Sequence, residues 1–172
     1  MPYSFGYFDT NIDAFARALA PTGKILDVGA GAGKFGWILK KSFPDGIDGL
    51  EIFNPYIDQF NLLTAYKNIY HGDIRLFPVG VGEYDLILMG DIVEHLSVRA
   101  AQITIARLVD TGAHVLVMAP YLYPQGESHD NEHEAHLQPD ITREVFLDRY
   151  PGALLLLDND QQGVFLFRGK DR

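Results

Sequence analysis

A run of small residues stands where a buried strand is predicted to end. The apolar segment 24–28, Lys-Ile-Leu-Asp-Val, is followed at once by Gly-Ala-Gly-Ala-Gly at 29–33. Small residues let a backbone approach a ligand closely, and the helix that follows presents free N–H groups in its first turn. Asp27, two residues before the first glycine, can brace this turn and stand near a cationic group. The alternative is that Asp27 only caps the turn, as aspartate often does.

The same glycines also fit a dinucleotide-binding fingerprint in a different register. Gly31-x-Gly33-x-x-Gly36 has the required spacing. In that fingerprint the first glycine directly follows the strand, and here that residue is Gly29. A motif that began at Gly29 would need glycine at position 34, which is Lys34. The register therefore disfavours a nicotinamide dinucleotide.

Carboxylates follow the next two predicted strands. Glu51 ends the second strand, where a carboxylate can accept two hydrogen bonds from a ribose diol. Asp73 and Ile74 follow the third strand, where an acid can accept from the amine of adenine while an apolar neighbour packs on the ring. Simpler interpretations stay open: Glu51 as a solvated strand end, and Asp73 as the N-cap of a short turn over 74–76.

Two groups that can move protons, Asp91 and His95, follow the fourth predicted strand in the sequence Asp91-Ile-Val-Glu94-His95-Leu. If the helix predicted over 93–109 starts here, Asp91 can cap it and Glu94 completes a capping box. His95 then lies one turn after Asp91 on the same face. Such a pair can deprotonate an acceptor hydroxyl or amine, because histidine titrates near neutral pH. A structural role is the alternative.

The nine residues 128–136 hold three histidines and three carboxylates. They fall in a polar segment, 121–139, that has no helical or strand period and is predicted to be a loop. The cluster could be a solvated loop, a substrate pocket or a divalent-metal site. Its spacing is not the helical His-Glu-x-x-His of zinc proteases, and we assign no metal ligand. Because the loop follows the fifth strand, it reaches the sheet edge of the glycine turn. Four of its residues are predicted to face a substrate: Tyr121, Asn131, Glu134 and His136.

The elements that must position these residues alternate along the chain. The predicted strands span 24–28, 47–52, 68–71, 84–89, 113–118, 153–157 and 163–167, and the helices span 12–19, 32–42, 55–66, 93–109 and 141–149. The repeated β-then-α alternations imply right-handed crossovers and a mostly parallel sheet covered on both faces. A hairpin at Asn159 and Asp160 must join the last two strands, so the last one is antiparallel. The predicted fold is α/β, with three layers around seven strands.

Length and composition narrow the function classes. The 172 residues suit a single domain over 1–172, whose aromatic N-terminal segment, 1–22, packs on the core edge or caps the site. A net charge of −9 without a basic patch disfavours nucleic-acid binding. The absence of cysteine excludes disulfides, thiol nucleophiles and Cys-based zinc sites. Without a membrane-length apolar run or a signal-peptide pattern, the chain is predicted to be cytoplasmic and to bind no membrane.

In this order and spacing, the segment 27–33, Glu51, Asp73-Ile74 and Asp91 resemble the motifs of class I S-adenosylmethionine-dependent methyltransferases, the Rossmann-like methyltransferase superfamily. The resemblance extends along most of the chain. It implies that fold, with S-adenosylmethionine as cofactor and S-adenosylhomocysteine as product. The residues that it implies as cofactor contacts are Asp27, Gly29, Ala30, Gly31, Gly33, Glu51, Ile52, Asp73, Ile74, Gly90 and Asp91, the last beside the methyl group.

The resulting prediction is an enzyme that methylates oxygen or nitrogen of a small molecule. Asn131-x-x-Glu134-x-His136 is similar to an element of some small methyltransferases of bacterial glycan and secondary-metabolite pathways. Asp91, His95 and His136 are the candidate catalytic residues. The alternatives are a non-catalytic S-adenosylmethionine-binding protein and a nicotinamide-dependent oxidoreductase, which would need a second domain. Monomer and homodimer both stay open.

Overall fold

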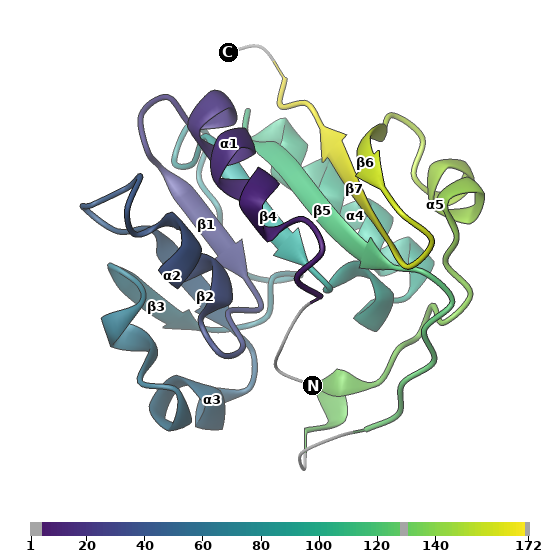
Figure 1. The fold of residues 1–172 in the computed structure, drawn as a ribbon, viewed down its shortest axis with the longest axis horizontal. Helices are drawn as coiled ribbons and strands as arrows, with labels where there is room; N and C mark the ends of the chain where they lie inside the picture. The colour runs from purple at the N-terminus through teal and green to yellow at the C-terminus, as the bar shows by residue number, and fades with distance from the viewer. Residues whose placement is uncertain (1–4, 128–130, 171–172) are drawn as a thin grey trace.

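A computed structural model describes residues 5–127 and 131–170 of the chain. Its centre is one seven-stranded sheet in the order β3-β2-β1-β4-β5-β7-β6 (Figure 1). The strands are β1 (Ile25–Val28), β2 (Asp48–Glu51), β3 (Asn68–His71), β4 (Leu86–Gly90), β5 (His114–Pro120), β6 (Leu154–Asp158) and β7 (Gln162–Phe167).

The strand directions match the prediction of a mostly parallel sheet with an antiparallel last strand. β1 pairs in parallel with β2 and β4, β2 with β3, and β4 with β5. β7 inserts between β5 and β6 and is antiparallel to both. The hairpin before it is closed by Asn159, whose side-chain oxygen accepts from the N–H groups of Gln161 and Gln162 at 2.8 and 2.9 Å. The predicted fold class is confirmed.

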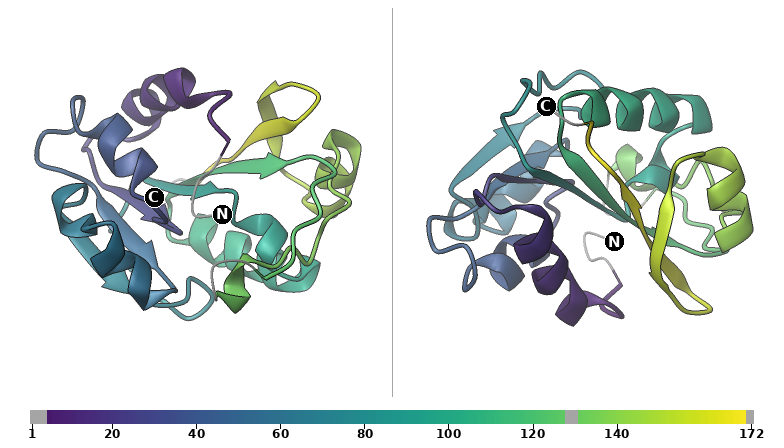
Figure 2. Two further views of the ribbon diagram at one scale, coloured as in Figure 1. Left: turned by 60° about the horizontal axis from the view of Figure 1, so that its bottom comes forward. Right: turned by 90° about the horizontal axis from the view of Figure 1, so that it is seen from above.

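Helices cover both faces of the sheet, which gives the three layers (Figure 2). Along β4, Leu86 and Leu88 pack into one core, while Ile87 and Met89 pack into the other, as the period-2 alternation of a strand requires. The first core, which contains Leu86 and Leu88, is covered by α1 (Asp9–Leu19), α2 (Lys34–Leu39) and α3 (Asn54–Gln59). The second core, which contains Ile87 and Met89, is covered by α4 (Val98–Asp110) and α5 (Arg143–Arg149).

Among the described residues, no helix combines the length and the apolar character needed to cross a membrane.

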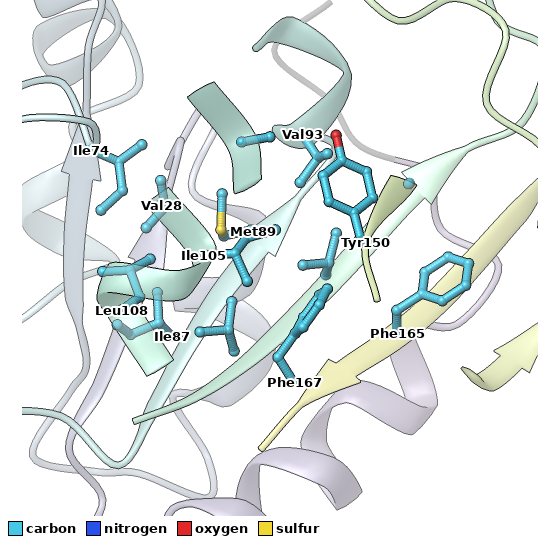
Figure 3. Packing of buried hydrophobic residues seen from close by; sticks show 14 of the residues in the cluster. Val28, Ile74, Ile87, Met89, Val93, Ile105, Leu108, Tyr150, Phe165 and Phe167 are labelled. Carbon is cyan, nitrogen blue, oxygen red and sulfur yellow. The ribbon is translucent and has the colours of Figure 1, made fainter. Parts of the chain in front are cut away.

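The second core ties the end of the chain to the sheet (Figure 3). Phe146 of α5 stacks on Phe165 of β7, with ring centroids 3.8 Å apart and an interplanar angle of 14°. Tyr150 packs against Phe146 at 4.7 Å. Because α5 follows the long loop after β5, this aromatic packing anchors the far end of that loop.

The helix predicted over 55–66 is shorter in the structure. α3 ends at Gln59, and Asn61 has a left-handed backbone with φ of 47°. A separate 3-10 turn, η1 (Leu62–Thr64), follows and buries Leu62 completely. Asparagine tolerates the left-handed region better than most residues. The helix therefore ends before Asn61, and the turn that follows places Leu62 in the first core.

The helix predicted over 93–109 also starts later, at Val98. Asp91 has φ of 53°, which turns the chain out of β4, and a 3-10 turn, η2 (Val93–His95), comes next. Ser97 is the residue that caps α4, since its hydroxyl accepts from the Ala100 N–H at 3.3 Å. The predicted capping box at Asp91 and Glu94 is therefore wrong, and so is the placement of Asp91 and His95 on one helical face.

Candidate functional site

Two adjoining cavities lie at the carboxyl ends of the parallel strands, the edge at which open α/β sheets bind ligands. The first has a volume of about 350 Å³ and is lined by the turn 29–31, by Glu51 and Asp91, and by parts of η2 and the loop after β5. The second has a volume of about 450 Å³ and extends along β2 and β3. Both cavities are lined by Gly29, Ile52, Ile92, His95 and His133.

The glycine turn closes against β2 and against the loop after β4. The N–H groups of Gly29 and Ala30 donate to Leu50 O at 2.8 and 3.1 Å. Gly29 has φ of 73°, and a Cβ added there would lie 2.1 Å from Cδ1 of Ile92. Only glycine satisfies both the left-handed backbone and this close approach. The turn therefore forms a tight backbone wall between the cavities.

Glu51 is held on that wall by two backbone hydrogen bonds. Its Oε2 accepts from Gly31 N and its Oε1 from Phe53 N, both at 2.8 Å. Burial raises the pKa of Glu51, and these two N–H groups oppose the shift. A carboxylate has about four lone-pair sites, so each oxygen can still accept a hydrogen bond from a ligand. The side chain faces the first cavity, as a ribose-binding role requires.

Asp27 lies beneath the turn and is 1% exposed. Its Oδ2 accepts from the Tyr66 hydroxyl at 2.5 Å, while its Oδ1 is buried without a hydrogen-bond partner. Burial, reinforced by the charge of Glu51, outweighs the Tyr66 hydrogen bond and raises the pKa of Asp27 to about 7. The position braces the turn from below and places a titratable acid under the first cavity.

The second cavity has aliphatic side chains in its walls and charged residues on two sides, Asp73 and Arg75 after β3 and Glu127 and Glu132 from the loop after β5. Leu50, Ile52 and Ile74 line it together with Ile92. At the rim, Asp73 forms an ion pair with the Arg75 guanidinium at 2.5 Å and also accepts from Arg75 N at 2.9 Å. Burial works against the shift, yet the hydrogen bonds and charge of Arg75 lower the pKa of Asp73. Asp73 therefore does organise the turn after β3, and a base bound in this slot would share its carboxylate with Arg75.

Asp91 lines the first cavity, where two distant segments hold its side chain. Oδ2 accepts from Phe5 N, and Oδ1 accepts from Nε2 of Gln162 in β7, both at 3.0 Å. The carboxylate thus faces the N-terminal segment and β7, whereas His95 turns toward the loop after β5. The predicted Asp91–His95 proton pair is not formed in this arrangement.

His95 and His136 meet at the far wall of the first cavity. Their rings are edge to face, with centroids 4.6 Å apart. Nδ1 of His95 lies 3.2 Å from Ala135 O, and Nδ1 of His136 lies 2.6 Å from Tyr123 O. Burial lowers both pKa values, and His136 adds to the shift that brings the pKa of His95 to about 4. Both imidazoles are therefore neutral near pH 7.

Glu94, beside His95, is fully buried and lines the same wall. Neither of its carboxyl oxygens has a hydrogen-bond partner. Burial, together with the charge of Asp91, raises the pKa of Glu94 well above its ordinary value. A buried polar group without a partner is rare and calls for a physical explanation.

The loop after β5 brings two more of the predicted residues to the first cavity. Oε1 of Glu134 accepts from the Tyr56 hydroxyl at 3.1 Å, and its Oε2 accepts from Gln125 Nε2 at 3.2 Å. Asn131 caps the 3-10 turn η3 (Glu132–Glu134) by accepting from His133 N at 3.0 Å. His129 and Asp130, which belong to the predicted cluster, lie outside the described residues.

The field in the first cavity is negative. Glu51, Asp91 and Glu134 all line it. Among the described lining residues, Lys34 supplies the positive charge, and its Nζ is 2.8 Å from Asp9 and 2.6 Å from Phe5 O. A cavity with this balance favours a cationic ligand over an anionic one.

Comparison with known proteins identifies solved structures that have a similar fold. No family model and no curated protein matches the sequence. Solved structures do match. PigF with SAH has a TM-score of 0.65 at 16% identity, covering 95% of this chain and 56% of PigF. The TehB-like SAM-dependent methyltransferase of Corynebacterium glutamicum has a TM-score of 0.63 at 19% identity, covering 96% and 89%. SAM-bound CalS10, an amino pentose methyltransferase of Micromonospora echinaspora, has a TM-score of 0.61 at 15% identity, covering 92% and 89%.

The chain has the class I methyltransferase fold. At these identities the likeness concerns the fold, and the chain spans just over half of the length of PigF. The strand order of this methyltransferase fold places β1 and β4 side by side at the centre of the sheet. The glycine turn, Glu51 and Asp91 consequently meet at one edge.

Some predicted residues of the methyltransferase fold lie away from the cavities. Gly33 is not among the described residues that line either one. It precedes α2 with φ of 84°, and a Cβ there would contact Leu62 and Ala65 at 3.2 and 3.3 Å. Tyr121 is likewise absent from the described lining and packs against the second core. Strand β5 runs to Pro120, which turns Tyr121 toward that core, and Tyr123 takes the place by the cavity.

Other cavity residues escaped the sequence analysis altogether. Tyr56, Tyr123 and Gln125 line the first cavity, and Ile92 separates it from the second. The Tyr56–Glu134 hydrogen bond joins residues far apart in the sequence, and no local spacing of residues predicts such a pair.

Proposed function

We propose that this chain is an S-adenosylmethionine-dependent methyltransferase that transfers a methyl group to oxygen or nitrogen of a small-molecule acceptor. The observation that carries the proposal is the pair of cavities on either side of Gly29, with Glu51 facing the first. Leu50, Ile52 and Ile74 lie in the walls of the second cavity, and Glu51 and Asp91 line the first. These walls suit a ligand that has an adenine at one end and a cationic sulfonium amino acid at the other.

The residues fit such a cofactor in a definite order. The base would lie in the second cavity between Ile52 and Ile74, with the Asp73 rim beside its amine. Glu51 would accept hydrogen bonds from the ribose hydroxyls. The amino-acid part would follow Gly29–Gly31 toward Asp91, above the buried acid Asp27.

The remaining wall of the first cavity would receive the acceptor. It is formed by Asn131, Glu134, His95 and His136 together with Tyr123. The sulfonium supplies an activated methyl group, so the protein mainly has to align the acceptor atom and exclude water. With the cofactor bound, the sulfur–carbon bond would break as a carbon–oxygen or carbon–nitrogen bond formed, and the acceptor would give up a proton. His95 or His136 can take that proton, because both imidazoles are neutral near pH 7.

We further propose that residues 1–172 act as one domain in which Phe5 and Gly6 close the site. Phe5 and Gly6 line the first cavity. The Phe5 ring contacts Tyr123 edge to face at 5.4 Å, and Phe5 N donates to Asp91. The next helix, α1, instead packs into the first core through Ile12 and Ala16, so the cap would be confined to the segment before it.

Calorimetric titration tests the cofactor directly. S-adenosylmethionine and S-adenosylhomocysteine should each bind with one site per chain, and NADH should not bind. Tight NADH binding without binding of either sulfur compound would favour an oxidoreductase and refute the proposal. Turnover is then measured with a panel of hydroxyl and amine acceptors. Cofactor binding with no methyl transfer to any acceptor would favour a non-catalytic binding protein.

A further inference from the structure

We propose that Glu94, His95 and His136 bind a divalent transition-metal ion at the wall of the first cavity. Each side chain offers one ligand atom, and the three atoms lie within 4.8 Å of one another. All three residues line that cavity. Two of them are adjacent in η2, and the third comes from the distant loop after β5.

The two segments that carry these residues are joined by backbone hydrogen bonds. Glu94 O accepts from Leu137 N and Gln138 N at 2.7 and 3.1 Å. The Gln138 side chain reaches across and donates to Val93 O and Leu96 O, both at 2.9 Å. The fold therefore brings the three side chains together by itself. An ion site needs its ligand side chains to be held in place before the ion binds.

Both histidines are oriented as metal ligands usually are. A ligating imidazole commonly donates its second ring N–H to a carbonyl or carboxylate, which sets the tautomer. Nδ1 of His95 faces Ala135 O at 3.2 Å, and Nδ1 of His136 faces Tyr123 O at 2.6 Å. A carbonyl only accepts, so Nδ1 carries the hydrogen in each ring. Each Nε2 then keeps a free lone pair for an ion.

Glu94 supplies a second, independent observation. Its side chain is 0% exposed, and both carboxyl oxygens are buried without a hydrogen-bond partner. Leaving a carboxyl group in this condition costs free energy, whereas a coordinated cation would satisfy it. The unpartnered oxygens sit in the same cluster as the two imidazoles.

The donor set indicates the class of ion. Two imidazoles and one carboxylate suit Zn²⁺, Co²⁺, Mn²⁺ or Fe²⁺, while Mg²⁺ and Ca²⁺ prefer oxygen ligands alone. Three protein ligands leave at least one coordination position open, as in catalytic rather than structural zinc sites. Because the three residues line the first cavity, the open position faces the space assigned above to the acceptor.

A bound ion would also indicate which class of molecule accepts the methyl group, and this part of the inference rests on the proposed methyl transfer. A hydroxyl oxygen bound to the ion would be oriented toward the methyl group and would lose its proton more readily. That proton passes to water, the sulfur–carbon bond breaks, and a carbon–oxygen bond forms. His95 and His136 then act as ligands rather than as bases, and the acceptor is an alcohol or a phenol.

Cobalt binding tests the site without any cofactor. Metal-free protein is titrated with Co²⁺, and the visible d–d absorption is followed until it saturates at one ion per chain. Zn²⁺ should displace the cobalt. His136→Ala and Glu94→Gln should each weaken Co²⁺ affinity at least about tenfold. The matched control is His133→Ala, which removes an imidazole from the same loop and cavity but outside the cluster, and it should bind Co²⁺ as the wild type does.

The outcomes separate the two proposals. Absence of saturable Co²⁺ binding overturns the ion site, and so does wild-type affinity in His136→Ala. An equal loss in His133→Ala also overturns it, because the loop in general would then bind the metal. Glu94 is buried, so its variant is checked by thermal unfolding, and the half-buried His136 decides if Glu94→Gln fails to fold. Cobalt binding without S-adenosylmethionine binding refutes methyl transfer alone, and the reverse result refutes the ion site alone.

Discussion

The two walls of the first cavity are built in different ways. The glycine-turn wall is local to two neighbouring strands: Gly29–Gly31 follows β1, Glu51 ends β2, and the two are joined by the 2.8 Å hydrogen bond from Gly31 N. The histidine wall combines η2 after β4 with the loop after β5, through contacts such as His95 with Ala135. One wall follows from short motifs and the strand order. The other exists only when distant segments meet.

This difference suggests a division of labour. The glycine-turn wall, called the local wall below, would hold the cofactor, and the histidine wall would bind the acceptor. A substitution on one wall should therefore leave the function of the other intact. The predictions below test that separation.

The largest effect is expected at Glu51 on the local wall. Glu51→Ala should weaken S-adenosylmethionine binding by about 1.5–3 kcal/mol, because charge-assisted hydrogen bonds to the ribose are lost. The dissociation constant is measured by calorimetry. Glu83→Ala is the control, since Glu83 is exposed and outside both cavities, and it should bind normally. An unchanged dissociation constant in Glu51→Ala would refute the ribose role.

His136 tests the opposite wall. His136→Ala should lower turnover by roughly ten- to a hundredfold, the lower end of the usual contribution from a proton-transfer or positioning group. The S-adenosylmethionine dissociation constant should not change, because His136 contacts Tyr123 and His95 rather than the glycine turn. Single-turnover rates with saturating cofactor measure the first quantity and calorimetry the second. Weaker cofactor binding with normal turnover per bound cofactor would break the proposed division.

A substitution at Gly29 tests how closely the glycine turn must pack against Ile92. Gly29→Ala forces a side chain into a left-handed backbone and against Ile92, so it should lower the free energy of unfolding by about 1–2 kcal/mol and also weaken cofactor binding. Gly152→Ala, at φ of 93° with nothing within 4 Å of the added Cβ, should show the stability loss alone.

A second variant sharpens the comparison between these glycines. Ile92→Val removes Cδ1, the atom 2.1 Å from the added Cβ. It should therefore restore part of the cofactor affinity in the Gly29→Ala background. Urea unfolding and calorimetry measure the two effects. Equal cofactor affinity in Gly29→Ala and Gly152→Ala would show that the close approach of Ile92 is unimportant.

The smallest effect on cofactor binding is expected from Asp27, the acid beneath the local wall, whose titration should instead change the free energy of unfolding. The pKa of Asp27 is raised from 3.8 to about 7 in the folded protein, so the native state holds this proton more tightly than the unfolded chain. The contribution of Asp27 to the free energy of unfolding should therefore be largest below the unfolded pKa. It should fall by up to about 4 kcal/mol, at about 1.4 kcal/mol per pKa unit, as the pH rises toward about 7, and then level off.

Asp27→Asn cannot ionise and should lack this dependence. The free energy of unfolding in urea is measured for both proteins over this pH range, and the difference between them isolates the one carboxyl group. Parallel curves for the wild type and the variant would mean that Asp27 is ionised throughout, so the local wall would not hold a buried acid.

Local sequence patterns were sufficient for most of the sheet and for the local wall. The strand predicted over 68–71 coincides with β3, and the antiparallel β7 followed from the missing helix before it. Helix starts were less predictable. Asp91 looked like a cap because aspartate often is one, yet its carboxylate binds Phe5 N and Gln162, and Ser97 caps α4 instead.

The sequence by itself determined the fold class and the glycine-turn wall, because both depend on residue periodicity and on backbone geometry a few positions long. Only the tertiary structure decided that Tyr123 rather than Tyr121 faces the cavity and that Glu94 and His95 meet His136. These outcomes depend on where β5 ends and on hydrogen bonds between Glu94 and the loop at 137–138. Contacts between segments so far apart leave no mark in the local spacing of residues, since each segment alone is compatible with many partners.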